Sequence, residues 1–179
     1  MTKTAVTYGD SLYELAEEEK ITDVILSEMK MADEVFRENP DYIRILREPS
    51  IAKKDRLKLI DEAFSEKVHM YLLSFMKILV ENDYIGEFSG CMREFARRYN
   101  LANGISEALV TSAVRLDENQ KKALVVKLEK ISGKKVILKE KIDERSIAGL
   151  KVEMDGKQYD GTVSGRIRNI EKKVSDIIV

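Results

Sequence analysis

His69 and Cys91 are the first candidates for chemistry, because the chain has one histidine and one cysteine. A Ser-His-Asp or Cys-His site would have to use His69 as its base. No Gly-x-Ser-x-Gly elbow accompanies it. We expect His69 at the start of a helix and Cys91 as a packed or half-exposed thiol. The sequence therefore indicates no catalytic residue.

The sequence also lacks a pattern of residues typical of a metal or nucleotide site. Glu17, Glu18 and Glu19 are consecutive, and consecutive helical residues point in different directions, so their carboxylates cannot converge on one ion. The sequence has neither a Gly-x-x-x-x-Gly-Lys-Ser/Thr string nor a Gly-x-Gly-x-x-Gly string. We expect no metal, cofactor or nucleotide to bind.

Two other classes of protein stay open as alternatives. Lysines cluster from Lys121 to Lys141, which could mark a helical scaffold that binds RNA, and salt-dependent retention on RNA would favour it. Glu129 and Glu140 interrupt the cluster, however, and no aromatic residue is interleaved for base stacking, so we expect no nucleic-acid partner. A small hydrolase would need a convergent polar pocket, which one histidine does not supply.

Composition bounds the class of protein. The chain has 179 residues, 44% hydrophobic and 35% charged, which suits one medium domain or two small ones with a solvated surface. A single cysteine excludes an internal disulfide and fits a reducing compartment. The start has no apolar signal segment, and the apolar runs are far shorter than the roughly 20 residues that span a bilayer. We expect any membrane link to go through a partner.

The first half of the chain is expected to be helical, because apolar residues recur at helical spacing from Thr4 to Asn103. Pro40 and Pro49 separate segments, Ser65 is a candidate N-cap for the fifth helix, and Gly104 is a candidate C-cap for the sixth. The six apolar stripes are Ala5, Tyr8, Leu12, Leu15 and Ala16; Ile25, Met29, Ala32 and Phe36; Tyr42, Ile45 and Leu46; Leu57, Ile60 and Phe64; Val68, Leu72, Phe75, Met76 and Leu79; Ile85, Phe88, Met92, Phe95 and Tyr99.

The second half changes period. Residues 105–114, 136–142 and 150–154 are expected to be strands, and Asp155-Gly156 is typical of a type I′ hairpin turn that leads to a strand over 157–160. Asp117 and Gln120 form a capping-box pattern for a helix that ends at Gly133. A last helix is expected from Thr162 or Ser164, with its stripe at Ile167, Ile170, Val174, Ile177 and Ile178.

These patterns predict an α+β protein, with an N-terminal six-helix bundle over 1–104 and a small C-terminal α/β domain over 105–179. The first part holds 15 Lys or Arg and 20 Asp or Glu, a net charge of −5, and the second holds 16 and 12, a net charge of +4. The opposite charges favour different partners, and ordinary solvated surfaces explain them nearly as well.

Motifs along most of the chain resemble the delta subunit of F-type ATP synthases, the family that includes the mitochondrial oligomycin-sensitivity-conferring protein. Thr7-Tyr-Gly-Asp-Ser-Leu-Tyr-Glu-Leu-Ala16 is similar to the family's Arg-Tyr-Ala-x-Ala-Leu-Phe-Glu-Leu-Ala. Asn39-Pro40 with Leu46-x-x-Pro49, Val110-Thr-Ser-Ala113 with Leu116, and Ser132-Gly-Lys134 resemble further motifs of that family.

The most specific likeness lies near the C-terminus. Ile142-Asp143, Ile147-Ala-Gly149, Tyr159-Asp-Gly161 and Arg166 are similar to the family's Val-Asp-x-x-x-Ile-Gly-Gly, Asp-Gly-Ser and Arg-Leu. From the residues, we expect Gly149 at a bulge or close backbone approach, Gly161 in a turn with positive φ, and Asp160 pairing with Arg166 or capping. The chain departs from the family at Thr7 for arginine, Asp10 for lysine, Ala148 for glycine and Thr162 for serine.

The resemblance implies a non-catalytic stator subunit, present in one copy in a hetero-oligomeric complex. It implies that the helical part binds the N-terminal helix of an alpha subunit between the first and fifth helices, and that the C-terminal part holds the b subunits. It also implies a peripheral location on the cytoplasmic face of the cell membrane. By motif position, the candidate contacts are Tyr8, Ser11, Leu12, Leu15, Ile78 and Leu79. Leu12, Leu15 and Leu79 are also on stripes assigned to the core, so Tyr8, Ser11 and Ile78 are favoured as outward contacts.

Overall fold

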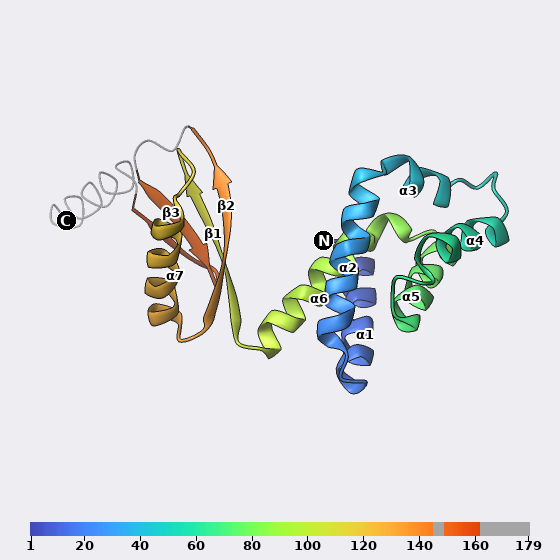
Figure 1. The fold of residues 1–179 in the computed structure, drawn as a ribbon, viewed down its shortest axis with the longest axis horizontal. Coiled ribbons are helices and arrows are strands. Elements are labelled where there is room, and N and C mark those ends of the chain that lie inside the picture. The colour runs from blue at the N-terminus through green and yellow to red at the C-terminus, as the bar shows by residue number, and fades with distance from the viewer. Residues whose placement is uncertain (145–148, 162–179) are drawn as a thin grey trace, which may run out of the picture. The chain divides into compact units, whose positions relative to one another are not determined.

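The structure is a computed structural model that describes residues 1–144 and 149–161. Within these residues the chain forms seven α-helices, one 3-10 helix and four β-strands (Figure 1). It divides into two compact units, the first over Met1–Tyr99 and the second beginning at Asn100. The mixed α/β class is as the sequence predicts. The last predicted helix, with its stripe from Ile167 to Ile178, lies outside the described residues.

The first unit is helical. Its elements are α1 (Lys3–Glu18), α2 (Thr22–Glu38), α3 (Pro40–Leu46), α4 (Lys53–Phe64), α5 (Met70–Glu81), a 3-10 helix η1 (Ile85–Glu87) and α6 (Phe88–Ala102), whose last residues extend into the second unit. Asn39 and Pro40 separate α2 from α3, because a residue before proline is disfavoured in helical backbone. Gly104 follows α6 with a φ of 61°, as a helix-ending glycine should.

The start of α5 differs from the prediction. Ser65 ends α4, and its N–H donates to the carbonyl oxygen of Asp61 at 3.0 Å. α5 begins after His69, whose Nδ1 accepts the N–H of Tyr71 at 3.3 Å. His69 is therefore the N-cap, and Val68 lies before the helix although it is buried. A turn over residues 65–67 separates α4 from the start of α5.

The sixth predicted helix is also divided. Ile85 lies in η1 rather than in α6, which begins at Phe88, and both side chains are buried. Phe36 lies at the centre of the core, with ring centroids 5.0 Å from Phe88 and 5.5 Å from Phe64 in edge-on contacts. Such rings add specific contacts to the burial of apolar area. The helical unit therefore has one continuous core.

α1 packs closely on α6 within this unit. A Cβ on Gly9 would lie 2.6 Å from the carbonyl oxygen of Cys91, and a Cβ on Gly90 would lie 2.7 Å from the Cβ of Ala5. Glycine is required at both positions because the two backbones approach too closely for a side chain. At the N-terminus of α1, the Ala5 N–H donates to Oγ1 of Thr2 at 3.1 Å, a standard cap. This packing fixes the orientation of α1.

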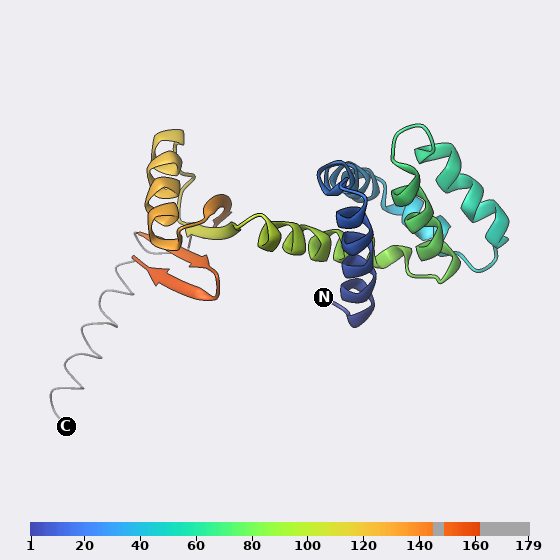
Figure 2. The same ribbon diagram turned by 90° about the horizontal axis from the view of Figure 1, so that it is seen from below.

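The second unit is a sheet with one helix, α7 (Glu118–Ser132). The strands β1 (Ile105–Ser112), β2 (Lys135–Ile142), β3 (Leu150–Met154) and β4 (Lys157–Asp160) lie in the order β2-β1-β3-β4. β1 is parallel to β2 and antiparallel to β3, and β4 is antiparallel to β3. α7 stacks on one side of the sheet (Figure 2). The core between them contains Ala108, Val110, Leu116, Leu128, Val136, Val152 and Met154.

Local signals in this unit are confirmed. The Asp117 carboxylate accepts the N–H of Gln120 at 2.8 Å, and the Gln120 side chain accepts the N–H of Asp117 at 3.1 Å, which completes the capping box. Gly133 ends α7 with a φ of 68°. Asp155 and Gly156 have φ values of 50° and 73°, as a type I′ turn requires. These short motifs fold as their residues predict.

Candidate helix-binding groove

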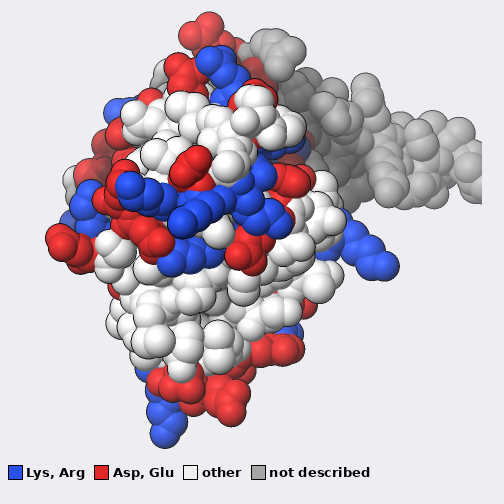
Figure 3. Space-filling model, turned by 90° about the vertical axis from the view of Figure 1, so that its right-hand side faces the viewer, with Lys and Arg blue, Asp and Glu red and all other residues white. Residues whose placement is uncertain are grey.

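A groove of about 450 Å³ lies between α1 and α5. Its lining contains no charged side chain and consists of Thr7, Tyr8, Ser11, Leu12, Leu15, Tyr71, Ser74, Phe75 and Ile78. Figure 3 shows a face of the molecule with a broad area free of Lys, Arg, Asp and Glu, framed by charged side chains. A hollow of this composition suits an apolar ligand surface.

Both walls of the groove repeat one arrangement of residues. Each wall presents a tyrosine, then a serine, then two apolar side chains at positions i, i+3, i+4 and i+7, which is one face of a helix. The floor residues Leu12 and Phe75 are buried, and the serines Ser11 and Ser74 on the rim are exposed. The two sets are Tyr8, Ser11, Leu12 and Leu15 on α1, and Tyr71, Ser74, Phe75 and Ile78 on α5.

The two walls run antiparallel. Tyr8, near the start of α1, contacts Phe75 and Tyr84 edge-on, with centroids 6.4 and 5.8 Å apart. At the other end, Tyr71 in the first turn of α5 lies near Glu19, the C-cap of α1. The negative charge of Glu19 raises the pKa of Tyr71, because a phenolate beside a carboxylate is unfavourable. The uncharged groove therefore ends beside a carboxylate.

The structure brings together five of the six predicted contact residues and separates the sixth. Tyr8, Ser11, Leu12, Leu15 and Ile78 line the groove. Leu79 does not line it and is fully buried in the core.

Leu15 was expected on the core stripe, and this was wrong. Its side chain is 37% exposed, and the side chain of Ile78 on the other wall is 44% exposed, so neither is covered although both line the groove. The tyrosine-serine-apolar pattern at 8, 11, 12 and 15 repeats at 71, 74, 75 and 78. That repeat is the sequence signal that would have added Tyr71, Ser74 and Phe75 to the predicted set.

Cys91 and His69, the other candidates for chemistry, have structural roles in the fold. Cys91 is fully buried on α6, and burial raises the pKa of its thiol to about 12, which keeps it protonated near neutral pH. No group of three or more His, Cys, Asp or Glu side chains in residues 1–144 and 149–161 could hold a metal ion. His69 serves as a helix cap.

Several lysines of the basic cluster are paired with acidic neighbours. Lys121 lies 2.9 Å from the Glu140 carboxylate and 3.0 Å from that of Glu118. Lys134 lies 3.1 Å from Asp155. These pairs reduce the positive potential that a nucleic-acid surface would need.

Of the four residues of the predicted structural motif near the C-terminus, Gly149, Asp160 and Gly161 are in the described part of the chain. Gly149 has a φ of 130°, which favours glycine. Gly161 was expected at positive φ, and this was wrong: its N–H donates to the carbonyl oxygen of Leu150 at 2.9 Å, where a Cβ would lie 3.1 Å from the same oxygen. Asp160 ends β4 opposite Lys151. Arg166 lies outside the described residues.

Comparison with known families identifies the family of the chain. The family described as ATP synthase delta (OSCP) subunit matches residues 4–174. The chain belongs to this family. It is thus a non-catalytic subunit of the peripheral stalk of ATP synthase, as the sequence motifs indicate.

Individual relatives agree over nearly the whole chain. The chain is 29% identical to the ATP synthase subunit delta of Clostridioides difficile (strain 630) over 172 residues, which cover 96% of this chain and 95% of the relative. It is 32% identical over 165 residues to that of Clostridium botulinum (strain Langeland), with 92% of each chain covered.

A solved structure has the same fold. A chain in the cryo-EM structure of the Toxoplasma gondii mitochondrial ATP synthase hexamer matches with a TM-score of 0.77 at 10% identity, covering 97% of this chain and 98% of that one. At this identity the likeness supports the fold alone. No helix in the described part of the chain has the length and apolar character needed to span a membrane.

Proposed function

We propose that the groove between α1 and α5 binds the N-terminal helix of the ATP synthase alpha subunit. The observation that carries this proposal is the uncharged groove with unpartnered apolar side chains on both rims, in a member of the delta subunit family. An amphipathic helix would cover Leu15 and Ile78 with its apolar face, as in other helix-in-groove complexes. Tyr8 and Ser11 would contact the same helix.

The second unit is proposed to hold the C-terminal ends of the b subunits that rise from the membrane. The catalytic head must not turn with the rotor, so a stator needs one attachment to the head and one to the peripheral stalk. The chain would be present in one copy and lie on the cytoplasmic face of the cell membrane, held there by its partners. This arrangement resists torque without chemistry in the subunit itself.

We also propose that the domain boundary lies near residue 104 and that the helices before it act as one bundle. Gly104 lies between the end of α6 at Ala102 and the start of β1 at Ile105. A bundle that moves as one body would transmit force from the groove to the second domain through α6.

The test is a calorimetric titration of the purified protein with a peptide of the alpha-subunit N-terminus from the same organism. We expect one-to-one binding, and Ile78→Asp should weaken it at least about tenfold, because a charge would be buried against the apolar face of the peptide. Ile45→Asp is the matched control, since Ile45 on α3 is 42% exposed, against 44% for Ile78, and lies outside the groove.

The control separates a local effect from loss of the fold. Circular dichroism of both variants should match the original protein, and Ile45→Asp should bind the peptide normally. Failure of the original protein to bind both the peptide and the assembled catalytic head would contradict the proposed function. Equal loss of binding in the two variants would contradict the groove as the site.

A further inference from the structure

The groove is uncharged along its length but carries carboxylates where it ends. The α1 face that includes Leu15 continues by helical spacing to Glu18 and Glu19, three and four residues further on. Both side chains are exposed at the carboxyl end of α1, the end at which the helix dipole places partial negative charge. At the opposite end, Glu81 lies three residues beyond Ile78 on α5 and is also exposed.

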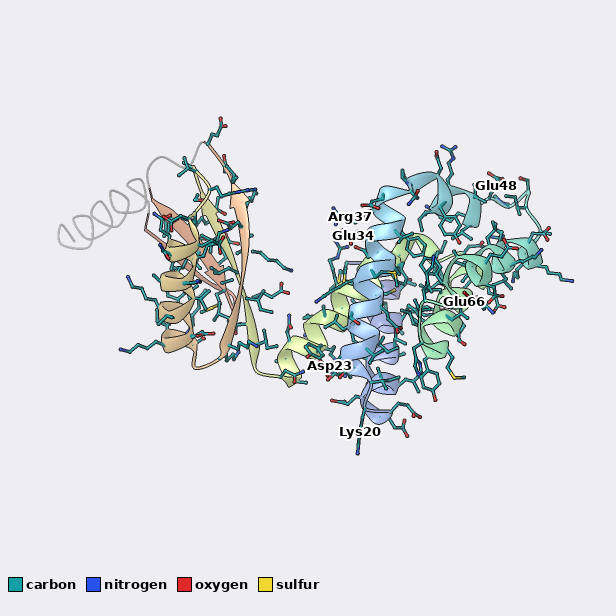
Figure 4. The ribbon with its side chains drawn as sticks, viewed as in Figure 1. Lys20, Asp23, Glu34, Arg37, Glu48 and Glu66 are labelled. Atoms are coloured by element: carbon teal, nitrogen blue, oxygen red, sulfur yellow. The ribbon has the colours of Figure 1, made fainter. Side chains whose placement is uncertain are left out.

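These carboxylates are not neutralised within the described chain. The last turns of α1 and α5 contain no basic residue, and no Lys or Arg in residues 1–144 or 149–161 forms an ion pair with Glu18, Glu19 or Glu81. Lys20 follows directly in sequence, but it adopts a φ of 59° at the turn between α1 and α2 and is exposed there (Figure 4). Within the described residues, these three carboxylates therefore have no ion-pair partner and can pair with basic side chains of a ligand.

Glu19, at the acidic end of the groove, lies beside a residue of the groove wall. Glu19 lies close enough to Tyr71, a lining residue, to perturb its phenol. A ligand that covers Tyr71 must therefore meet the field of Glu19, and Glu18 is beside it. An acidic ligand end would be repelled there, and a basic one would be attracted.

We infer that the groove selects an amphipathic helix whose apolar stripe is flanked by Lys or Arg. At the Tyr71 end of the groove, Glu18 and Glu19 form ion pairs with these basic side chains. This inference rests on the proposed function of the groove and adds the charge pattern of the ligand. The apolar lining supplies contact area without fixing how far along the groove the helix lies. The flanking ion pairs set that position and exclude acidic helices.

The test uses two designed helical peptides with the same apolar stripe, one flanked by lysines and the other by glutamines, together with the alpha-subunit peptide. The lysine-flanked peptide should bind the full-length protein roughly fivefold more tightly at low salt, the sum of a few exposed ion pairs. High salt should remove most of this advantage, because exposed charges are screened.

Protein variants assign the effect to the proposed residues. Glu18→Gln with Glu19→Gln should reduce the advantage of the lysine-flanked peptide about threefold or more. Glu34→Gln with Glu38→Gln is the matched control, because both side chains are exposed on α2 and outside the groove. Glu34 is labelled in Figure 4, and Glu38 is the last residue of α2. This control should leave the advantage unchanged.

The outcomes separate the inference from the function on which it rests. If all three peptides bind and Ile78→Asp weakens them, but lysine and glutamine flanks bind equally, the charge inference is overturned and the groove stands. An unchanged lysine advantage in the Glu18→Gln, Glu19→Gln variant also overturns the assignment to these residues. If no peptide binds at all, the proposed function and the inference both fail.

Discussion

The two faces of α1 meet their neighbours in opposite ways. Toward α6, Ala5 and Gly9 allow the backbones to approach so closely that no added Cβ fits. Toward α5, Leu15 stays exposed on one wall of a groove, and Ile78 stays exposed on the other. Small residues in close contact, as between α1 and α6, indicate packing within the chain. Exposed apolar side chains, as in the groove toward α5, indicate a surface that a partner buries.

The largest expected effect compares two leucines on α1. Leu12→Ala should lower the free energy of unfolding by about 3 kcal/mol, because Leu12 is buried and its removal leaves a cavity. Leu15→Ala should cost well under half as much stability and should weaken binding of the alpha-subunit peptide. Urea denaturation and calorimetric titration measure the two quantities. Equal loss of stability in both variants would contradict the assignment of Leu15 to an open face.

The next effect tests the closed face. Gly9→Ala should destabilise the protein by roughly 2 kcal/mol, although alanine normally favours a helix, because its Cβ would press on the backbone at Cys91. Gly86→Ala is the control, since the nearest atoms belong to the flexible side chain of Arg47. Thermal denaturation of both variants gives the comparison. A stable Gly9→Ala protein would show that α1 and α6 are less tightly packed than described.

The third prediction concerns a substitution that fills the groove. Ser74→Trp should reduce peptide affinity at least about tenfold, because the indole would occupy the groove, and should change stability by less than about 0.5 kcal/mol at this exposed site. Ser27→Trp on α2 is the matched control, as Ser27 is an exposed helical serine outside the groove. Normal peptide binding by Ser74→Trp would argue against the groove.

The smallest effect is a change in one pKa. Glu19→Gln should lower the pKa of Tyr71 toward its ordinary value, because the charge of Glu19 is the main cause of its rise. NMR titration of a protein with labelled tyrosine rings can follow Tyr71 alone, with Glu34→Gln as the control. An unchanged Tyr71 titration would place Glu19 away from the end of the groove.

Features set by neighbours in sequence could be predicted. The Asp117 and Gln120 capping box, the helix end at Gly133 and the Asp155-Gly156 turn depend on a few adjacent residues, and all three are present. The apolar stripes likewise placed the helices. Ser65 was misassigned because serine is a common cap, whereas the cap is His69, a residue seldom used in that role.

Features set by distances between helices could not be predicted. A stripe shows which side of α1 is apolar, but it does not show that α5 leaves Leu15 uncovered while Leu79 is buried. The need for glycine at position 9 depends on the carbonyl oxygen of Cys91, more than 80 residues away in sequence. The groove is therefore a property of packing, although the residues that line it repeat along the sequence.

The most direct test of the groove is an NMR titration of isoleucine-methyl-labelled protein with the alpha-subunit N-terminal peptide. Ile78 and Ile45 have nearly the same exposure, so they report on two surfaces with equal sensitivity. We predict that the Ile78 methyl signals shift in a saturable one-to-one titration while those of Ile45 stay in place. A titration that shifts Ile45 or isoleucines of the second unit and leaves Ile78 unchanged would contradict the account.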